Sequence, residues 1–254
     1  MGQALLGGWL DNGHAAKTIL VVEPAGLPPP LDTVAVVSDA SQIPESFKPA
    51  VIVLAVKPQM LAQTLPDYAR FGDAVFLTIA AGKPLRFYKE ILGETATIVR
   101  AMPNTPAAIR KGITVCYATT AVNAKTRALC ASLLEAVGLV EWIDDEGLMD
   151  AVTAVSGSGP AYVFLLAEVM AAAGIRAGLP EALANKLARA TVAGAGELLN
   201  TSAETPTQLR NNVTSPGGTT AAALEVLMDD KRGISDLMRE AVSAAIKRGQ
   251  DLAK

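Results

Sequence analysis

The sequence is poor in the residues that mark disulfide frameworks, metal sites and nucleic-acid binding. It has two cysteines, one histidine and only 4% aromatic residues. Cys116 and Cys130 lack CxxC spacing, so neither a disulfide framework nor a metal site is expected, and a reducing cytoplasm fits this usage. A formal net charge of −3, with no cluster of lysine and arginine, argues against a nucleic-acid partner.

Apolar runs of membrane-spanning length are also missing. The longest run, residues 161–174, is too short to cross a bilayer and contains Glu168. It is interpreted as a buried helix, and no membrane partner is expected. No signal peptide is recognisable, so the predicted location is cytoplasmic.

What the chain does have is a core of aliphatic residues and enough length for two domains. Half of its 254 residues are hydrophobic. In the first half, short β-branched runs alternate with helical stretches such as 58–70 and 84–92, which predicts a Rossmann-type, doubly wound α/β sheet. The predicted strands are 19–24, 33–38, 51–58, 74–82 and 97–103.

Ligands of doubly wound sheets bind at the carboxyl ends of the strands. Those ends are Glu23, the run Ala55, Val56, Lys57 and Pro58, the run Ala80, Ala81 and Gly82, and the pair Pro103 and Asn104. A carboxylate at Glu23 can accept hydrogen bonds from an adenosine ribose and would repel a 2′-phosphate. The cofactor is therefore expected to be NADH or NADPH, with a lean to NADH.

The beginning of the chain resembles the end of a glycine-rich dinucleotide turn. Gly2 and Gln3 open a helical stretch, but the first strand and the first glycines of such a turn are absent. A first strand lies in the middle of a doubly wound sheet, so its absence is expected to leave two strand edges unpaired and to weaken cofactor binding. An upstream extension with a β-branched strand ending in Gly-x-Gly is expected to restore both.

The second half is predicted to be all-helical, with helices over 161–177, 180–199, 219–229 and 234–253. Their long Ala/Leu-rich faces favour packing against another subunit. The predicted domains are a dinucleotide-binding domain over 1–143 and a helical substrate and dimerisation domain over 144–254.

The motif VTSPGGTT at 213–220 is the most informative stretch. Ser215 is a candidate cap, Pro216 suits a first helical position, and Gly217 and Gly218 allow close backbone approach. A bare helix start binds anions such as a carboxylate. Thr219 and Thr220 could orient the rest of a small acid.

A second glycine-rich motif, SGSGP at 156–160, is interpreted as another ligand-ready helix start, with Ser156 and Ser158 as candidate caps. It is not a nucleophile elbow, because that motif needs Gly-x-Ser-x-Gly and a histidine partner. The only histidine, His14, lies far away in sequence.

Taken together, six blocks resemble the pyrroline-5-carboxylate reductase family across essentially the whole chain. They are AVKPQ (55–59), TIAAG (78–82), RAMPNTPA (100–107), AVTAVSGSGPAY (151–162), AGLP (177–180) and VTSPGGTT (213–220). Two departures stand out. Only Met1 and Gly2 remain of the family's glycine-rich turn, and Ala203 stands where many members have a glutamate, so the neighbouring Glu204 inherits no role.

The resemblance implies hydride transfer from a reduced nicotinamide to the C=N bond of a cyclic imino acid, giving L-proline, in a homodimer or a higher assembly. It implies a substrate carboxylate on the backbone of Ser215, Gly217, Gly218 and Thr219, and Thr220 as the catalytic residue that hydrogen-bonds the ring nitrogen. Ser158 and its loop would close the pocket, and the nicotinamide would lie near Ala80, Ala81, Pro103 and Asn104.

Two alternatives stay open. A β-hydroxyacid dehydrogenase shares the two-domain plan but would need a lysine on helix 161–177, which has none. A degenerate, non-catalytic homologue would oligomerise but bind cofactor weakly. Cofactor quenching of the fluorescence of Trp9 would distinguish them.

Overall fold

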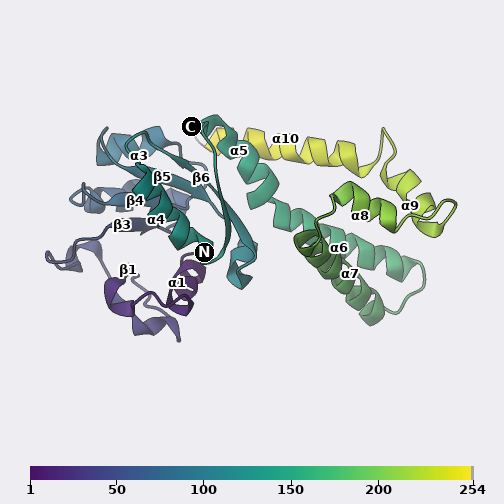
Figure 1. The fold of residues 1–254 in the computed structure, drawn as a ribbon, viewed down its shortest axis with the longest axis horizontal. Helices are drawn as coiled ribbons and strands as arrows, with labels where there is room; N and C mark the ends of the chain where they lie inside the picture. Colours follow the sequence, from purple (N-terminus) through teal and green to yellow (C-terminus); the bar gives the residue numbers. More distant parts are fainter. Residues whose placement is uncertain (253–254) are drawn as a thin grey trace. The chain divides into compact units, whose positions relative to one another are not determined.

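The structure is a computed structural model that describes residues 1–252 (Figure 1). The chain forms two compact units: residues 1–157 together with the stretch from Ala245 onward, and residues 158–244. The division reflects packing within one chain, and the domain boundary predicted at residues 143 and 144 remains a prediction. Each unit is described separately below.

The first unit is an α/β sandwich, which agrees with the predicted fold class. The five expected strands all form, but the single parallel sheet that was expected is wrong in two respects. β1 and β2 make a separate two-stranded parallel sheet, and β5 is joined by an antiparallel neighbour, β6, that the sequence reasoning missed together with β7. The larger sheet has the order β3-β4-β5-β6-β7, with parallel β3-β4-β5 and β6-β7 pairings. The strand bounds are β1 Leu20–Val22, β2 Ala35–Val37, β3 Val51–Leu54, β4 Val75–Thr78, β5 Ile98–Met102, β6 Gly112–Ala118 and β7 Gly138–Trp142.

The apolar sequence of β3 is typical of a central strand, but β3 has only one strand neighbour among residues 1–252. Its first three residues are half-exposed, whereas their partners on β4 are buried. The same is true of β1, which pairs only with β2. The structure therefore contains the two open strand edges that the sequence predicted.

Helices cover both faces of the larger sheet. On one face, Leu5 of α1 (Gly2–Asp11) and Leu134 of α4 (Ala124–Glu135) pack on β4 and β5. On the other face, Tyr88 of α3 (Leu85–Leu92) and Leu61 of α2 (Leu61–Thr64) do the same. The helix expected over 58–70 is instead three short pieces, because Pro66 interrupts it. The 3₁₀ turns are η1 Ala16–Thr18, η2 Leu31–Thr33, η3 Ala40–Gln42, η4 Pro58–Met60, η5 Leu65–Tyr68, η6 Thr105–Ile109 and η7 Glu146–Leu148.

The second unit is all-helical, as predicted. Small residues bring α6 and α7 together: Ala171, Ala184 and Ala188 are buried, and a Cβ at Gly174 would stand 3.5 Å from the Ala184 Cβ. A helix missed in the sequence, α8, precedes the VTSPGGTT motif, and α10 continues from this unit into the first. The bounds are α5 Met149–Val152, η8 Thr153–Gly157, α6 Gly159–Arg176, α7 Glu181–Thr201, α8 Pro206–Asn212, α9 Thr219–Leu227 and α10 Ile234–Leu252.

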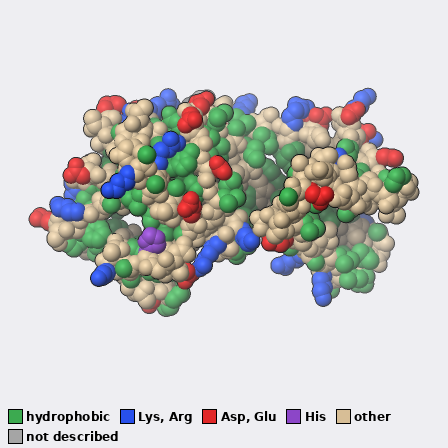
Figure 2. All heavy atoms as spheres, viewed as in Figure 1, with side chains coloured by type: hydrophobic (Ala, Val, Ile, Leu, Met, Phe, Trp, Pro, Cys, Tyr) green, Lys and Arg blue, Asp and Glu red, His purple; other side chains and the backbone are tan. Residues whose placement is uncertain are grey.

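The expectation that residues 161–174 form a buried helix is wrong for the single chain. Of α6, only Ala171 is buried, while Phe164 is 67% and Leu165 56% exposed. Hydrophobic side chains of this unit are visible at the surface (Figure 2). By length and composition alone, the helical stretch Glu146–Arg176 is also apolar enough to cross a membrane. Within the described residues, these apolar side chains are not covered.

Candidate functional site

The VTSPGGTT motif forms a tight turn ahead of α9, and the predicted capping pattern is wrong. The Gly218 N–H donates to the Ser215 carbonyl oxygen at 3.0 Å, and Gly217 has a φ of +67°. Proline followed by a glycine with positive φ is typical of a type II turn. Pro216 is therefore a turn residue and not the first residue of the helix, and Ser215 does not cap it. The positive φ is the reason why this turn needs glycine at position 217.

The start of α9 is nevertheless bare, as predicted. Gly218 is the N-cap and brings no side chain, and the first helical hydrogen bond runs from the Ala222 N–H to the Gly218 carbonyl at 3.2 Å. The amides of residues 219–221 are therefore left without partners inside the helix. The Gly218 amide, in contrast, is already engaged in the turn. The arrangement can bind a carboxylate beside the hydroxyls of Thr219 and Thr220.

Helix α8 immediately precedes this turn in the chain, and hydrogen bonds fix both of the helix's ends. It begins with a full capping box between Thr205 and Gln208. The Asn212 side-chain amide donates to both carboxylate oxygens of Glu204, at 2.9 and 3.1 Å, and the Thr214 hydroxyl donates to the Arg210 carbonyl at 2.6 Å. The spacing Thr-x-x-Gln at 205–208 is the sequence signal that could have revealed this helix.

The SGSGP motif leads into α6, as predicted, but it does so through a π-helical turn and without a side-chain cap. Residues Thr153–Gly157 form a π-helical turn between α5 and α6, and Ser158 has right-handed helical angles and makes no capping hydrogen bond. The prediction of Ser156 and Ser158 as caps is therefore wrong. A π-turn widens the helix and often marks a functional position. Met102 and Thr153 lie against Gly157, where a Cβ would stand 2.4 Å from the Met102 methyl group, so a larger residue would require the end of the Met102 side chain to shift.

Asn104 connects this π-turn to the sheet. Its side-chain oxygen accepts the Ile113 N–H at 3.0 Å, and its side-chain nitrogen donates to the Ser156 hydroxyl at 3.4 Å. Pro103 is buried beside it. The side chain of Asn104 thus has a structural use, and its predicted contact with a cofactor remains a prediction.

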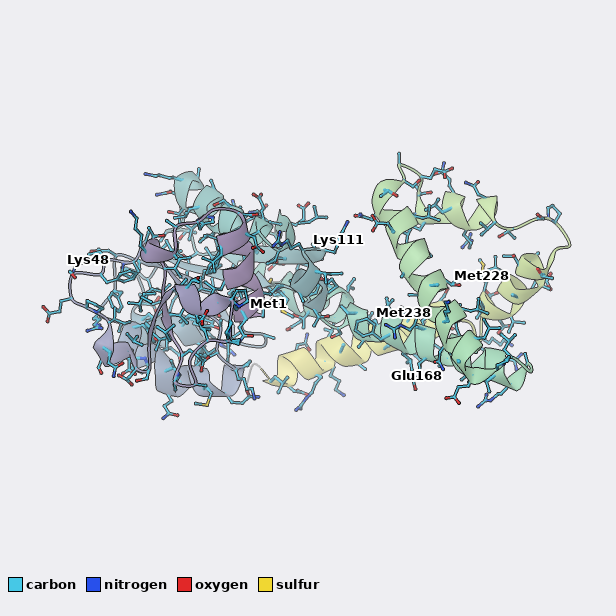
Figure 3. All side chains as sticks on the ribbon, turned by 90° about the horizontal axis from the view of Figure 1, so that it is seen from below. Met1, Lys48, Lys111, Glu168, Met228 and Met238 are labelled. Carbon is cyan, nitrogen blue, oxygen red and sulfur yellow. The ribbon has the colours of Figure 1, made fainter. Side chains whose placement is uncertain are left out.

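At the carboxyl end of β3, predicted cofactor residues of two elements come together. Met1, which is labelled in Figure 3, is the N-cap residue of α1 and makes no side-chain capping hydrogen bond. A Cβ at Gly2, the first residue of α1, would stand 3.0 Å from the Ala55 Cβ. The uncapped amides of α1, including that of Gln3, therefore lie beside the end of β3. This is the geometry that suits a phosphate group. Val56 and Lys57 follow on the surface and are exposed.

A cavity of about 370 Å³ opens next to the carboxyl edge of the sheet. It includes the predicted residues Pro58, Ala81 and Gly82, while Ala80 is buried behind them. Gly82 has a φ of +79°, which a side chain would strain. Eight further lining residues were not predicted. Gln59, Ala62, Lys83 and Phe87 lie within five residues of predicted positions, whereas Asp150, Thr153, Gly249 and Leu252 come from segments that are distant from them in sequence.

Glu23 follows β1 directly, as predicted. Its N–H donates to the Val37 carbonyl at 2.9 Å, and its Oε1 accepts the Ala25 N–H at 3.2 Å. Within residues 1–252 the other carboxylate oxygen has no hydrogen-bond partner. The carboxylate can therefore accept a hydroxyl at the strand end. The part of the chain that the structure describes contains no group of three histidine, cysteine or acidic residues placed to hold a metal ion.

Comparisons with known proteins agree with one another. The family model described as pyrroline-5-carboxylate reductase dimerisation matches residues 146–252. A pyrroline-5-carboxylate reductase of Synechocystis is 45% identical, over 80% of this chain and 75% of its own length, and one of Haemophilus influenzae is 35% identical over 99% and 94%.

Solved structures give the same result for the fold. A pyrroline-5-carboxylate reductase from Coxiella burnetii has a TM-score of 0.91 at 32% identity, and covers 100% of this chain and 95% of its own. A Plasmodium falciparum pyrroline carboxylate reductase, solved with NADP bound, has a TM-score of 0.84 at 27% identity, with the same coverage.

Proposed function

This chain belongs to the pyrroline-5-carboxylate reductase family, and on that premise we propose that it reduces 1-pyrroline-5-carboxylate to L-proline with NADH or NADPH, the last step of proline biosynthesis. The observation that carries the proposal is the uncapped start of α9 with two threonines in its first turn. It offers amide donors for a small carboxylate and a hydroxyl for the nitrogen next to it.

The substrate carboxylate binds the free amides of Thr219 and the two residues that follow it. This refines the expectation drawn from the family resemblance, because the Gly218 amide is used in the turn. A helix start contributes roughly 0.3–1 kcal/mol to binding an anion when exposed, and up to about 2 kcal/mol when partly buried. Gly217 sets the turn that leaves these amides open.

Thr220 is the catalytic residue in this proposal. Its hydroxyl accepts or donates a hydrogen bond at the ring nitrogen and holds the C=N bond in place. When bound, the reduced nicotinamide supplies a hydride to the imine carbon. The imine nitrogen is readily protonated before it enters, so the protein needs little general acid catalysis. This agrees with a chain whose only histidine, His14, lies in none of the motifs described above.

The residues at the sheet edge suit a dinucleotide. The uncapped start of α1 beside Ala55 fits the pyrophosphate, the cavity at Ala81 and Gly82 fits the nicotinamide, and Glu23 fits the adenosine ribose. Because a carboxylate at that position repels a 2′-phosphate, we propose a preference for NADH. The P. falciparum structure holds NADP, so the preference must be measured for this chain.

Self-association completes the proposal. Residues 146–252 match the family's dimerisation model, and the apolar surface of α6 lies within that range. A second copy covering this face would bury Phe164 and Leu165, each contributing about 1.5–3 kcal/mol. We propose a dimer or a higher assembly in the cytoplasm, with no membrane and no nucleic acid involved.

The test is turnover of 1-pyrroline-5-carboxylate by the purified chain with each reduced cofactor, followed by loss of nicotinamide absorbance and by amino-acid analysis of the product. L-Proline formed in proportion to cofactor oxidised supports the proposal. A chain that forms oligomers but neither binds nor oxidises either cofactor would instead be the non-catalytic homologue.

A further inference from the structure

A partly buried ion pair between Arg100 and Glu146 lies outside the lining of the cavity and has no role in the reaction as proposed. Within residues 1–252, Arg100 of β5 is the only charged residue that is buried, at 8% exposure. Its guanidinium pairs with the carboxylate of Glu146, which is the first residue of η7. A buried arginine is tolerated only where a partner compensates its charge, so Glu146 is held in place by β5.

The same carboxylate caps a helix in another part of the chain. Glu146 Oε1 accepts the N–H of Leu85, the first residue of α3, at 2.7 Å. Pro84, at the N-cap position, provides no side-chain hydrogen bond. A carboxylate at a helix start satisfies an unpaired amide and favours the helix dipole. Glu146 therefore caps the start of α3, although it is distant from α3 in sequence.

The segment before α3 is held at its other end by a second buried pair. The Thr78 hydroxyl is 2.7 Å from the Tyr88 hydroxyl, and it accepts the Ala80 N–H at 3.3 Å. Burial raises the pKa of Tyr88 above its ordinary value, although the hydrogen bond to Thr78 and the charge of Arg100 oppose this, so the phenol stays protonated and can donate. Residues 80–84 are thus fixed at both ends.

This fixed segment is the one that lines the cavity. Ala81, Gly82 and Lys83 contribute to the wall, and Lys83 also lies 5.1 Å from the centre of the Phe87 ring, which is on α3. Because these three residues join α3 through Pro84 alone, and Gly82 with a φ of +79° can adopt other backbone angles, we expect a change in where α3 begins to alter their placement.

We propose that Glu146 and Arg100 are positioning residues for the cofactor: by capping α3 they fix residues 80–84 in the shape that binds the nicotinamide end. This rests on the proposed function. The pair acts through the backbone and touches no reacting atom. Its effect belongs to cofactor affinity, and not to binding of the imine at α9.

The test compares Glu146→Ala, Glu146→Gln and Arg100→Lys with a matched control, Glu94→Ala. Glu94 forms an exposed 3.5 Å ion pair with Lys89 near the other end of α3, so the control removes a charge pair from the same helix. For each protein we would measure the cofactor Kd, the KM for cofactor and for imine, kcat, the melting temperature, and hydrogen–deuterium exchange of the peptide that covers residues 80–88.

In Glu146→Ala we expect the cofactor Kd and KM to rise about tenfold, as for loss of a charge-assisted hydrogen bond, while the KM for imine changes by less than about twofold. Glu146→Gln, which keeps an oxygen for Leu85, should lie between this variant and the wild type. Exchange in the 80–88 peptide should accelerate in both variants and stay unchanged in Glu94→Ala. If Glu146→Ala does not fold, Glu146→Gln and Arg100→Lys carry the test.

An unchanged cofactor Kd in folded variants, even with a lower melting temperature, would overturn the inference and reduce the pair to general stability. Exchange in the 80–88 peptide that matches the wild type would also overturn it. The cofactor Kd and the exchange rates can both be measured without turnover, so together they test this inference even for a chain without reductase activity. Absence of turnover in the wild type counts only against the proposed function.

Discussion

Replacing Thr220 by valine tests the proposed catalytic hydroxyl with little disturbance of the fold. Thr220 is the second residue of α9 and is half-exposed, and its hydroxyl has no hydrogen-bond partner within residues 1–252. Threonine and valine share a branched shape and a similar helix propensity. The free energy of unfolding should therefore change by less than about 0.5 kcal/mol.

The expected loss is in catalysis. A hydrogen bond to the ring nitrogen that is left unmade costs roughly 1–3 kcal/mol, which corresponds to about a tenfold to a hundredfold decrease in kcat/KM. Steady-state kinetics at saturating cofactor would measure it. If the hydroxyl also orients the bound imine, KM rises as well, and if it acts only as hydride is transferred, kcat alone falls.

Thr207→Val is the matched control, because Thr207 is the second residue of α8, is exposed, and precedes the motif on the neighbouring helix. It should keep both the melting temperature and kcat/KM of the wild type. Wild-type kcat/KM in Thr220→Val would refute the assignment and leave the bare helix start as an anion site without a catalytic hydroxyl.

Three further predictions concern the first unit. Glu23→Ser should raise the ratio of kcat/KM with NADPH to that with NADH, and a wild-type chain that already prefers NADPH strongly would contradict the ribose argument. Burial raises the pKa of Cys116 to about 12 and that of Cys130 to about 11, from 9.0. These thiols ionise more readily in the unfolded chain than in the folded one. The free energy of unfolding, measured in urea, should therefore be unaffected by them below about pH 9 and should decrease above that pH. A free energy of unfolding that is independent of pH between about 8 and 10.5 would contradict this prediction. Fusing a β-branched strand that ends in Gly-x-Gly ahead of Met1 should supply a neighbour for β1 and β3, raise the melting temperature and lower the cofactor Kd; equal values for both proteins would show that these edges accept no strand.

The sequence predicted those features whose signal is local. The five first strands are short β-branched runs that end in turn residues, and they formed where expected. The sequence-based prediction failed where the structure depends on contacts between residues that are distant in sequence. β6 (Gly112–Ala118) is just as β-branched as β5, but its antiparallel pairing depends on η6 returning the chain to the sheet, and no short-range pattern encodes that return.

The two glycine-rich motifs of the site were likewise predicted only in part. SPGG predicted an open helix start correctly, yet placed the helix too early, because Pro216 suits both a helix start and the second position of a β-turn. The positive φ of Gly217 decides between the two, and it is a property of the folded backbone. In SGSGP, a π-turn ahead of α6 places Gly157 against Met102, a residue far away in sequence, and no local pattern predicts that contact.

The surface of α6 shows what a single chain leaves undetermined. Hydrophobicity indicates that residues 161–174 are covered, but not by what, and within this chain only Ala171 of α6 is buried. If another part of this chain covered α6, Phe164 and Leu165 would be buried, and they are exposed. If α6 crossed a bilayer, Glu168 would lie in the apolar interior of the membrane, at a cost of several kcal/mol. A second copy can cover the apolar side chains while Glu168 stays at the margin in water. The match of residues 146–252 to a dimerisation model favours that copy, and the dimer proposed above would supply the burial that the sequence predicts for residues 161–174.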